Sequence, residues 1–315
     1  MASGLETLVV QTLNGLQFGF VLFLVASGLT VILGILDVLN LAHGELFAFG
    51  AYASVGIFGY VTGAIAAPVS GGIGTTIVFV IGILAAIVVT GLVLIPVGVV
   101  LESVFLRPIY ERDQVYQLVL TFALLLIIID VTKFVWGDVP IRTNSVYSGI
   151  NQIPTSELLG ITFPTYNVFA IVLGAVVVVG LFYFFARTKT GRIVRATAIN
   201  REMATAIGVS TDRVFTLVFA LGAFLAGIAG AVRVPPTAAT LEMGTNPLVL
   251  SFVVIVIGGL GSLRGAFVGA VVVGVLRSWM ISFYPPGEIA APFAIMAVIL
   301  LVKPEGLFGT WGETA

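Results

Sequence analysis

The sequence predicts an all-helical, polytopic transmembrane bundle that forms a single domain over residues 1–315. Charged residues make up only 9% of the chain, whereas a soluble domain usually has about 25%. Hydrophobic residues make up 59%, and they fall in runs of about 20, the length that a helix needs to cross a bilayer. Helices are expected because lipid offers no hydrogen-bond partner to backbone N–H and C=O groups.

Composition and charge also exclude several classes of protein. A soluble domain could not hide this much apolar surface. A formal net charge of −1 gives no field to attract the phosphates of a nucleic acid. The absence of cysteine excludes disulfides, thiolate catalysis and cysteine-ligated metals. No basic residue lies between Met1 and Glu6, so we expect no cleaved signal peptide.

The apolar runs predict about nine spans, and eight to ten are compatible with the pattern. The first four spans are expected at 9–36, 41–62, 76–101 and 115–136. The last five are expected at 166–186, 214–232, 248–263, 265–283 and 289–302. Within the fourth span, Asp130 and Lys133 lie about one helical turn apart, so we expect an ion pair between them.

The longest polar segments lie on either side of the fifth expected span, 166–186, and predict the orientation. The loop 187–213 holds six of the 14 lysines and arginines, so we place it in the cytoplasm. Alternation then places 137–165 outside, the charged turn 102–114 inside and the N-terminus outside. The outer loop 137–165 is therefore a candidate surface for an external partner.

The basic loop has an order that a simple tether would lack. Good helix formers over Ile193–Ile207 predict one short helix, and Gly208 ends it because a glycine readily takes the positive φ of this position. Ser210 or Thr211 can cap the next helix. Two interpretations remain open: the loop lies against anionic lipid headgroups, or the helix presents a small apolar face to a partner protein.

Four segments in this order resemble the permeases of ABC importers for branched-chain amino acids, the LivH/LivM-like family. Residues 192–214 are similar to the coupling loop of that family, and Phe219 to Gly230 to the helix that follows. Asn40-Leu-Ala-His-Gly-Glu45 and the glycine-rich segment Ile257 to Ala266 resemble two further motifs. The resemblance covers nearly the whole chain. The chain departs from the family at Ile199-Asn200-Arg201, where an acidic residue is common and where Glu202 follows instead.

The resemblance implies a division of labour among several proteins. A second permease subunit would complete the pathway, two cytoplasmic ATPase subunits would bind ATP and magnesium, and an extracytoplasmic solute-binding protein would deliver the amino acid. The expected ATPase-coupling residues are Ala196, Ala198, Arg201, Glu202, Met203, Ala204 and Gly208. The chain itself carries no G-x-x-x-x-G-K-[ST] phosphate loop, so we expect no enzyme activity and no cofactor on this subunit, which belongs in the cell membrane.

Polar residues interrupt the apolar pattern between the first two spans. They are Asp37, Asn40, His43 (the only histidine) and Glu45, and Gly44 between the last two can allow a kink or a close backbone approach. One interpretation is a cytoplasmic turn that caps a helix; another is a broken or re-entrant segment beside the pathway, a device common in transporters. One histidine and one glutamate fall short of a metal site, and a proton-coupled role stays open.

A second candidate for the pathway is the glycine-rich turn before the expected span 265–283. Its residues are Gly258, Gly259, Gly261 and Ser262. Their backbone amides could bind a substrate carboxylate, or the glycines could let two helices approach closely. Together with the interruption at 40–45, this turn could also mark an internal repeat.

Small residues spaced by four predict close helix contacts. Gly222, Ala226 and Gly230 share one helix face, as do Ala223, Gly227 and Ala231 in the same span.

The sequence as a whole predicts a permease subunit of an ABC importer that moves leucine, isoleucine, valine or a related amino acid by alternating access. The alternative is an ion-coupled secondary transporter or channel for a small polar solute such as urea, an amide or an amino acid. The sequence does not separate these substrates.

Overall fold

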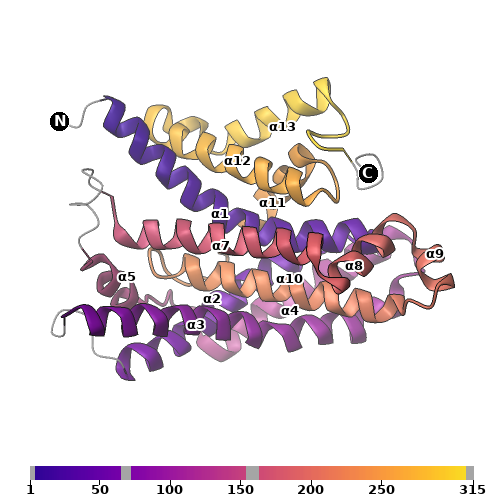
Figure 1. The fold of residues 1–315 in the computed structure, drawn as a ribbon, viewed down its shortest axis with the longest axis horizontal. Coiled ribbons are helices and arrows are strands. Elements are labelled where there is room, and N and C mark those ends of the chain that lie inside the picture. Colours follow the sequence, from indigo (N-terminus) through magenta and orange to yellow (C-terminus); the bar gives the residue numbers. More distant parts are fainter. Residues whose placement is uncertain (1–3, 65–71, 154–162, 310–315) are drawn as a thin grey trace.

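The computed structural model describes residues 4–64, 72–153 and 163–309 and confirms an all-helical bundle (Figure 1). In this described part, seven helices are long and apolar enough to cross a membrane. They are α1 (Gly4–Leu36), α2 (His43–Ala64), α3 (Gly72–Val100) with its π-helical extension η2 (Leu101–Leu106) and 3-10 turn η3 (Arg107–Ile109), α4 (Gln114–Trp136), α7 (Thr165–Arg187), α10 (Thr211–Arg233) and α12 (Leu263–Phe283).

The remaining helices are shorter. Two of the nine expected spans are the apolar helices α11 (Thr245–Gly258) and α13 (Ala290–Val302), of 14 and 13 residues. Neither reaches the length of about 20 residues that crosses a bilayer alone. The other short elements are α5 (Asn144–Asn151), α8 (Lys189–Ile199), α9 (Arg201–Ala206) and η4 (Pro285–Gly287).

The bundle has two ends with different elements (Figure 1). One end carries α8 and α9, and we call it the coupling end. The other end carries α5, the start of α1 and η4, and we call it the distal end. The start of α1 is fixed there by a hydrogen bond between the side chains of Asn14 and Asn167, 3.2 Å apart, and by one from Ser278 to Gln11, of 2.9 Å.

Helices α1 and α10 form the centre of the bundle, and their glycines allow the close contacts. A side chain at Gly222 would meet Ile32, and one at Gly227 would meet Leu94 of α3. A side chain at Gly230 would meet the backbone of α2 at Phe47. The prediction that small residues spaced by four mark helix contacts is therefore confirmed for α10.

Helices α2 and α11 both begin inside the bundle. The ring of His43, the first residue of α2, lies beside Gly222, which is near the middle of the 23 residues of α10. The backbones of Gly44 and Gly244 touch, so α11 begins at the same level. The segments 37–42 and 234–244 therefore run into the bundle from opposite ends before each helix starts. We call this meeting point the half-helix junction.

This arrangement corrects one expectation from the sequence. The interruption that matches 40–45 in the second half is 234–244, and not the glycine-rich turn at 258–262. Helix α11 separates the glycine-rich turn from the half-helix junction, by roughly 20 Å at 1.5 Å per residue. The two interrupted helices start side by side and leave toward opposite ends, as in an inverted repeat.

The ion pair expected within α4 is also wrong. Lys133 pairs with Asp138, just past the end of the helix, at 2.9 Å. Both side chains are more than half exposed, at 52% and 66%. The reason is that Gly137 ends α4 with a φ of 86°, which turns the chain back toward the last helical turn.

Candidate functional site

The basic loop folds into two helices where one was expected. Asn200 interrupts the helical pattern with φ −151° and ψ 100°. Its side chain then accepts a hydrogen bond from the backbone N–H of Met203, 2.8 Å away, and so caps α9. Asparagine competes with helical hydrogen bonds in this way, and the cap satisfies an orphan N–H of the new helix. Gly208 has a φ of 86° and follows α9, as predicted.

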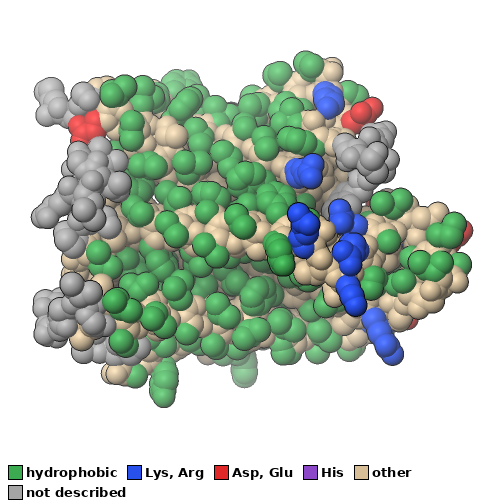
Figure 2. Space-filling model, in the orientation of Figure 1, with side chains coloured by type: hydrophobic (Ala, Val, Ile, Leu, Met, Phe, Trp, Pro, Cys, Tyr) green, Lys and Arg blue, Asp and Glu red, His purple; other side chains and the backbone are tan. Residues whose placement is uncertain are grey.

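The two helices present an exposed apolar surface at the coupling end. Ile199, Met203 and Ile207 are 59%, 61% and 72% exposed, which is unusual for large apolar side chains outside the lipid. Lysine and arginine side chains gather beside them (Figure 2). We call the three apolar residues the coupling surface.

The expected coupling residues occupy different positions on this end. Ala196, Arg201, Glu202 and Met203 are exposed, and Ala198 is half-buried. Ala204 is only 2% exposed, so it supports α9 from within. Ile207 was expected on the apolar face of this loop, whereas Ile199 was missed because the sequence did not show that α8 ends there.

A chain of contacts connects α9 to the interior of the bundle. The guanidinium of Arg201 lies 4.7 Å from the ring centre of Phe215 on α10. The ring of Phe215 makes an edge-to-face contact with Tyr110, at 5.5 Å. The hydroxyl of Tyr110 donates to Glu102 in η2, at 3.2 Å. Each step is a direct contact, so the chain of contacts links α9 to both α10 and the end of α3.

Glu102 is the centre of this group, which we call the Glu102 network. Its carboxylate is fully buried. It accepts hydrogen bonds from Arg107 at 3.2 and 2.9 Å and from the hydroxyl of Thr216 at 2.8 Å. Burial and the nearby Glu102 charge raise the pKa of Tyr110 far above its ordinary value, so this hydroxyl remains a donor. The sequence signal for this site was a lone carboxylate five residues before Arg107 at the end of an apolar run.

The half-helix junction collects buried polar side chains, several of whose atoms have no hydrogen-bond partner in the described part of the chain. Asn40, His43 and Glu45 are each at most 1% exposed. His43 Nε2 lies 3.1 Å from the carbonyl oxygen of Val25. Both amide atoms of Asn40, Nδ1 of His43 and Oε1 of Glu45 lack a hydrogen-bond partner among the described residues. Unpaired polar atoms are costly in a dry interior, so these atoms retain the capacity to hydrogen-bond to water or a solute.

The position of the junction decides between the two interpretations of the segment 40–45. A cytoplasmic turn would lie at the coupling end, whereas His43 lies beside the middle of α10. The segment is therefore re-entrant. Asn40 precedes the helix, and its carbonyl accepts from the backbone N–H of His43 at 3.2 Å.

The glycine-rich turn has a packing role in this structure. Gly258 touches the backbone of Gly265, and Gly259 and Gly261 have φ values of 101° and 77°. Ser262 accepts a hydrogen bond from the N–H of Gly265 at 3.1 Å and caps α12. The structure does not bring these residues near Asn40, His43 and Glu45, and a role in the pathway stays a prediction.

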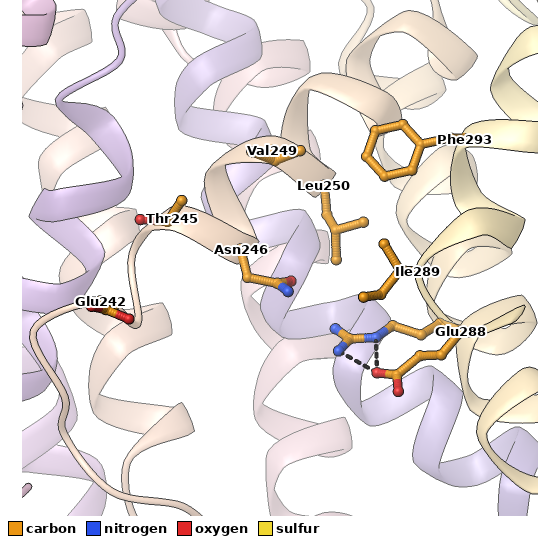
Figure 3. A pocket seen from close by; sticks show the side chains of 9 residues that line it. Glu242, Thr245, Asn246, Val249, Leu250, Glu288, Ile289 and Phe293 are labelled. Carbon is orange, nitrogen blue, oxygen red and sulfur yellow. Dashed lines mark hydrogen bonds and ion pairs between the residues drawn. The ribbon is translucent and has the colours of Figure 1, made fainter. Parts of the chain in front are cut away.

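A third feature is a pocket of about 580 Å³ between α11, α12 and the start of α13 (Figure 3). Its polar lining comes from Glu242, Thr245, Asn246, Arg277 and Glu288. Its apolar lining comes from Val249, Leu250, Ile289 and Phe293. No local sequence pattern indicates this pocket, because its walls come from segments up to about 50 residues apart.

Comparisons with known proteins agree over nearly the whole chain. A family model described as "Branched-chain amino acid transport system / permease component" matches residues 11–302. The chain is 28% identical over 308 residues to the high-affinity branched-chain amino acid transport system permease protein LivH of Salmonella typhimurium, covering 95% of this chain and 94% of the relative. It is 26% identical to BraD, the corresponding permease protein of Pseudomonas aeruginosa, covering 95% of each chain.

A more distant match concerns another solute. The fructose import permease protein FruF of Bifidobacterium longum is 32% identical over 152 residues, which cover 46% of this chain and 41% of that protein. No solved structure matches the chain.

Proposed function

Since the chain belongs to the family of permease components of branched-chain amino acid transport systems, we propose that it forms the transmembrane pathway through which an ABC importer moves leucine, isoleucine, valine or a related amino acid. It is a multi-pass membrane protein of the cell membrane. The observation that carries the proposal is the coupling surface, because exposed apolar residues on short helices beside basic side chains suit a protein partner.

The proposal gives each end of the bundle a partner. The coupling end faces the cytoplasm, because it carries the basic loop 187–213 and basic loops favour the cytoplasmic side. Two ATPase subunits bind there. ATP and magnesium bind to those subunits, and this chain needs no cofactor of its own. A solute-binding protein docks at the distal end, on the loop 137–165, and a second permease subunit completes the pathway.

The contacts within the chain support a mechanism of alternating access. A push on α9 is carried by Arg201 and Phe215 to α10, and by Tyr110 to Glu102. Helix α10 packs so closely on α2 that it cannot shift without moving the half-helix junction. The unpaired atoms of Asn40, His43 and Glu45 then gain water or substrate as partners, which lowers the cost of the open state.

A second candidate function rests on Glu45. A buried carboxylate with an unpaired oxygen is the kind of group that binds a proton or cation in ion-coupled transporters. Uptake that persists in proteoliposomes without any nucleotide, and that follows a proton or sodium gradient, would support this alternative against the ABC importer.

We expect that charge at the coupling surface disconnects the permease from its ATPase. In Met203→Glu and Ile207→Glu, a carboxylate replaces an apolar side chain at the proposed interface. Loss of one such interface anchor weakens association by about tenfold or more. Co-purification of the ATPase subunits and ATP-dependent uptake of labelled leucine in proteoliposomes measure the effect.

The matched control is Leu5→Glu, because Leu5 is 74% exposed at the start of α1, at the distal end and outside the loop 137–165. This variant should retain the ATPase subunits. Ala204 is unsuitable for the test, since its burial means that a large residue would disturb α9 itself. Full ATPase association in both Met203→Glu and Ile207→Glu would refute the coupling surface.

A further inference from the structure

The pocket between α11, α12 and α13 combines opposite charges with an apolar wall. Arg277 and Glu288 form an ion pair at 2.6 Å, with side chains that are only 20% and 31% exposed. Asn246 lies on the same side of the pocket, and Leu250, Ile289 and Phe293 stand above these polar groups (Figure 3). Its volume of about 580 Å³ lies in the range of small-molecule sites.

The ion pair leaves hydrogen-bonding capacity on both partners. Arg277 donates from Nε and from one terminal nitrogen to a single oxygen of Glu288, at 2.9 and 2.6 Å. A guanidinium has five N–H donors, so three remain. The second oxygen of Glu288 accepts no hydrogen bond from another described residue. The pair therefore offers free donors and a free acceptor side by side.

An aromatic ring of α1 packs against the guanidinium of Arg277 and fixes its orientation. Its guanidinium lies 4.7 Å from the ring centre of Phe18 on α1. Arg233 lies over the same ring at 5.6 Å, and no acidic side chain pairs with Arg233 in the described part of the chain. Glu242 and Glu288 line the pocket with Arg277, so two carboxylates and two guanidinium groups lie in or behind it, a balanced charge that suits a ligand with one charge of each sign.

We propose that this pocket binds the zwitterionic head of an α-amino acid, with its aliphatic side chain against Leu250, Ile289 and Phe293. The free N–H donors of Arg277 bind the carboxylate, and the free oxygen of Glu288 binds the ammonium. An α-amino acid carries these two charges on adjacent carbons, which matches neighbouring partners of opposite sign. Helix α11 begins in the pocket, and its N-terminus adds a favourable dipole for the carboxylate.

The location suits a site that receives substrate from outside. Glu288 and Ile289 lie between η4 and α13 at the distal end, while Asn246 and Val249 lie on α11, which starts at the half-helix junction. The pocket therefore extends from the distal end toward the re-entrant segments. This inference rests on the proposed function, because it names the substrate site of that transporter.

The test uses a diazirine analogue of leucine, which crosslinks through its side chain. The full chain, purified with the subunits that accompany it and held in lipid nanodiscs, is irradiated with the probe, and peptides are mapped by mass spectrometry. We expect label in peptides that contain residues 245–250 and 289–293. Leucine should compete for the label, whereas 4-methylpentanoate (no ammonium) and isoamylamine (no carboxylate) should each compete about tenfold less well or worse.

Three variants keep the test independent of folding. Val249→Trp should remove most of the label, because Val249 stands at the rim with 40% exposure and a large ring there fills the pocket. The control is Val176→Trp on α7, where Val176 is 63% exposed and lies outside the pocket. Glu288→Gln should reduce the advantage of leucine over 4-methylpentanoate while leaving its advantage over isoamylamine.

Several outcomes would overturn the proposal. Label outside both peptides, label unchanged in Val249→Trp, or equal competition by the single-charge analogues each exclude an amino-acid site. Labelling of the pocket by a photoactivatable phosphatidylethanolamine that leucine does not displace would identify a lipid headgroup site instead. ATP-dependent leucine uptake without label in the pocket would refute this inference alone. Label in the pocket without ATP-dependent uptake would refute only the proposed function.

Discussion

Replacing Gly44 by alanine should abolish uptake and lower the stability of the bundle. A Cβ at this position would lie 2.6 Å from the carbonyl oxygen of Gly244 and 2.7 Å from Cβ of Leu248. The first of these atoms belongs to the backbone, so the strain moves α2 and α11 apart. Overpacking of this kind costs about 1–3 kcal/mol. Thermal unfolding in detergent, followed by size-exclusion chromatography, measures the stability, and labelled-leucine uptake measures function.

The same helix provides a matched control. Gly56 lies on α2 with no atom within 4 Å of the place that a Cβ would take. Gly56→Ala should therefore keep uptake and raise helix stability slightly, because alanine favours a helix by about 1 kcal/mol over glycine. Equal behaviour of Gly44→Ala and Gly56→Ala would show that the half-helix junction tolerates separation and has no special place in transport.

Removing the charge of Glu102 should have the second large effect. In Glu102→Gln, Arg107 and Tyr110 lose the ionised acceptor that holds η2 against α10. Hydrogen bonds to a charged group contribute about 1.5–3 kcal/mol. Arg107 is 37% exposed and partly screened by solvent, so we expect a loss of about 1–3 kcal/mol in unfolding free energy. In the full complex, ATP hydrolysis should continue while uptake falls.

The exposed pair of Lys133 and Asp138 is the comparison for this variant. Asp138→Asn removes a carboxylate with the same 2.9 Å ion-pair distance, but from a solvated site. Because solvent screens this exposed pair, we expect little change in the free energy of unfolding, and uptake should remain coupled to ATP. If Glu102→Gln matched Asp138→Asn in both measurements, the Glu102 network would not carry the movement of α9.

The features that the sequence predicted well depend on local chemistry. The length of the apolar runs identified the spanning helices. Unpaired backbone N–H and C=O groups are costly in lipid, and a helix pairs them within one segment. Gly208 was identified as a helix end since its positive φ follows from the lack of a Cβ. The small residues of α10 were identified as packing sites by their spacing alone.

The features that it missed depend on the fold. The break at Asn200 was hidden by good helix formers on both sides, and only the capping bond to Met203 reveals it. The entry of 234–244 into the bundle was signalled weakly by Pro235, Pro236 and Gly244 before a short apolar run. The pairing of Glu102 with Thr216 joins residues 114 positions apart, which no local pattern can show.

The re-entrant segment 234–244 is also attached to the outer connection by two backbone hydrogen bonds. Ile141 donates to Ala239 at 3.1 Å, and Ala239 donates to Ile141 at 2.9 Å. A protein that displaces Ile141 would therefore pull on the segment whose last residue, Gly244, touches Gly44. Docking of a solute-binding protein at the exterior and movement of the ATPase subunits at the interior would thus both act on the contact between Gly44 and Gly244, from opposite faces of the membrane.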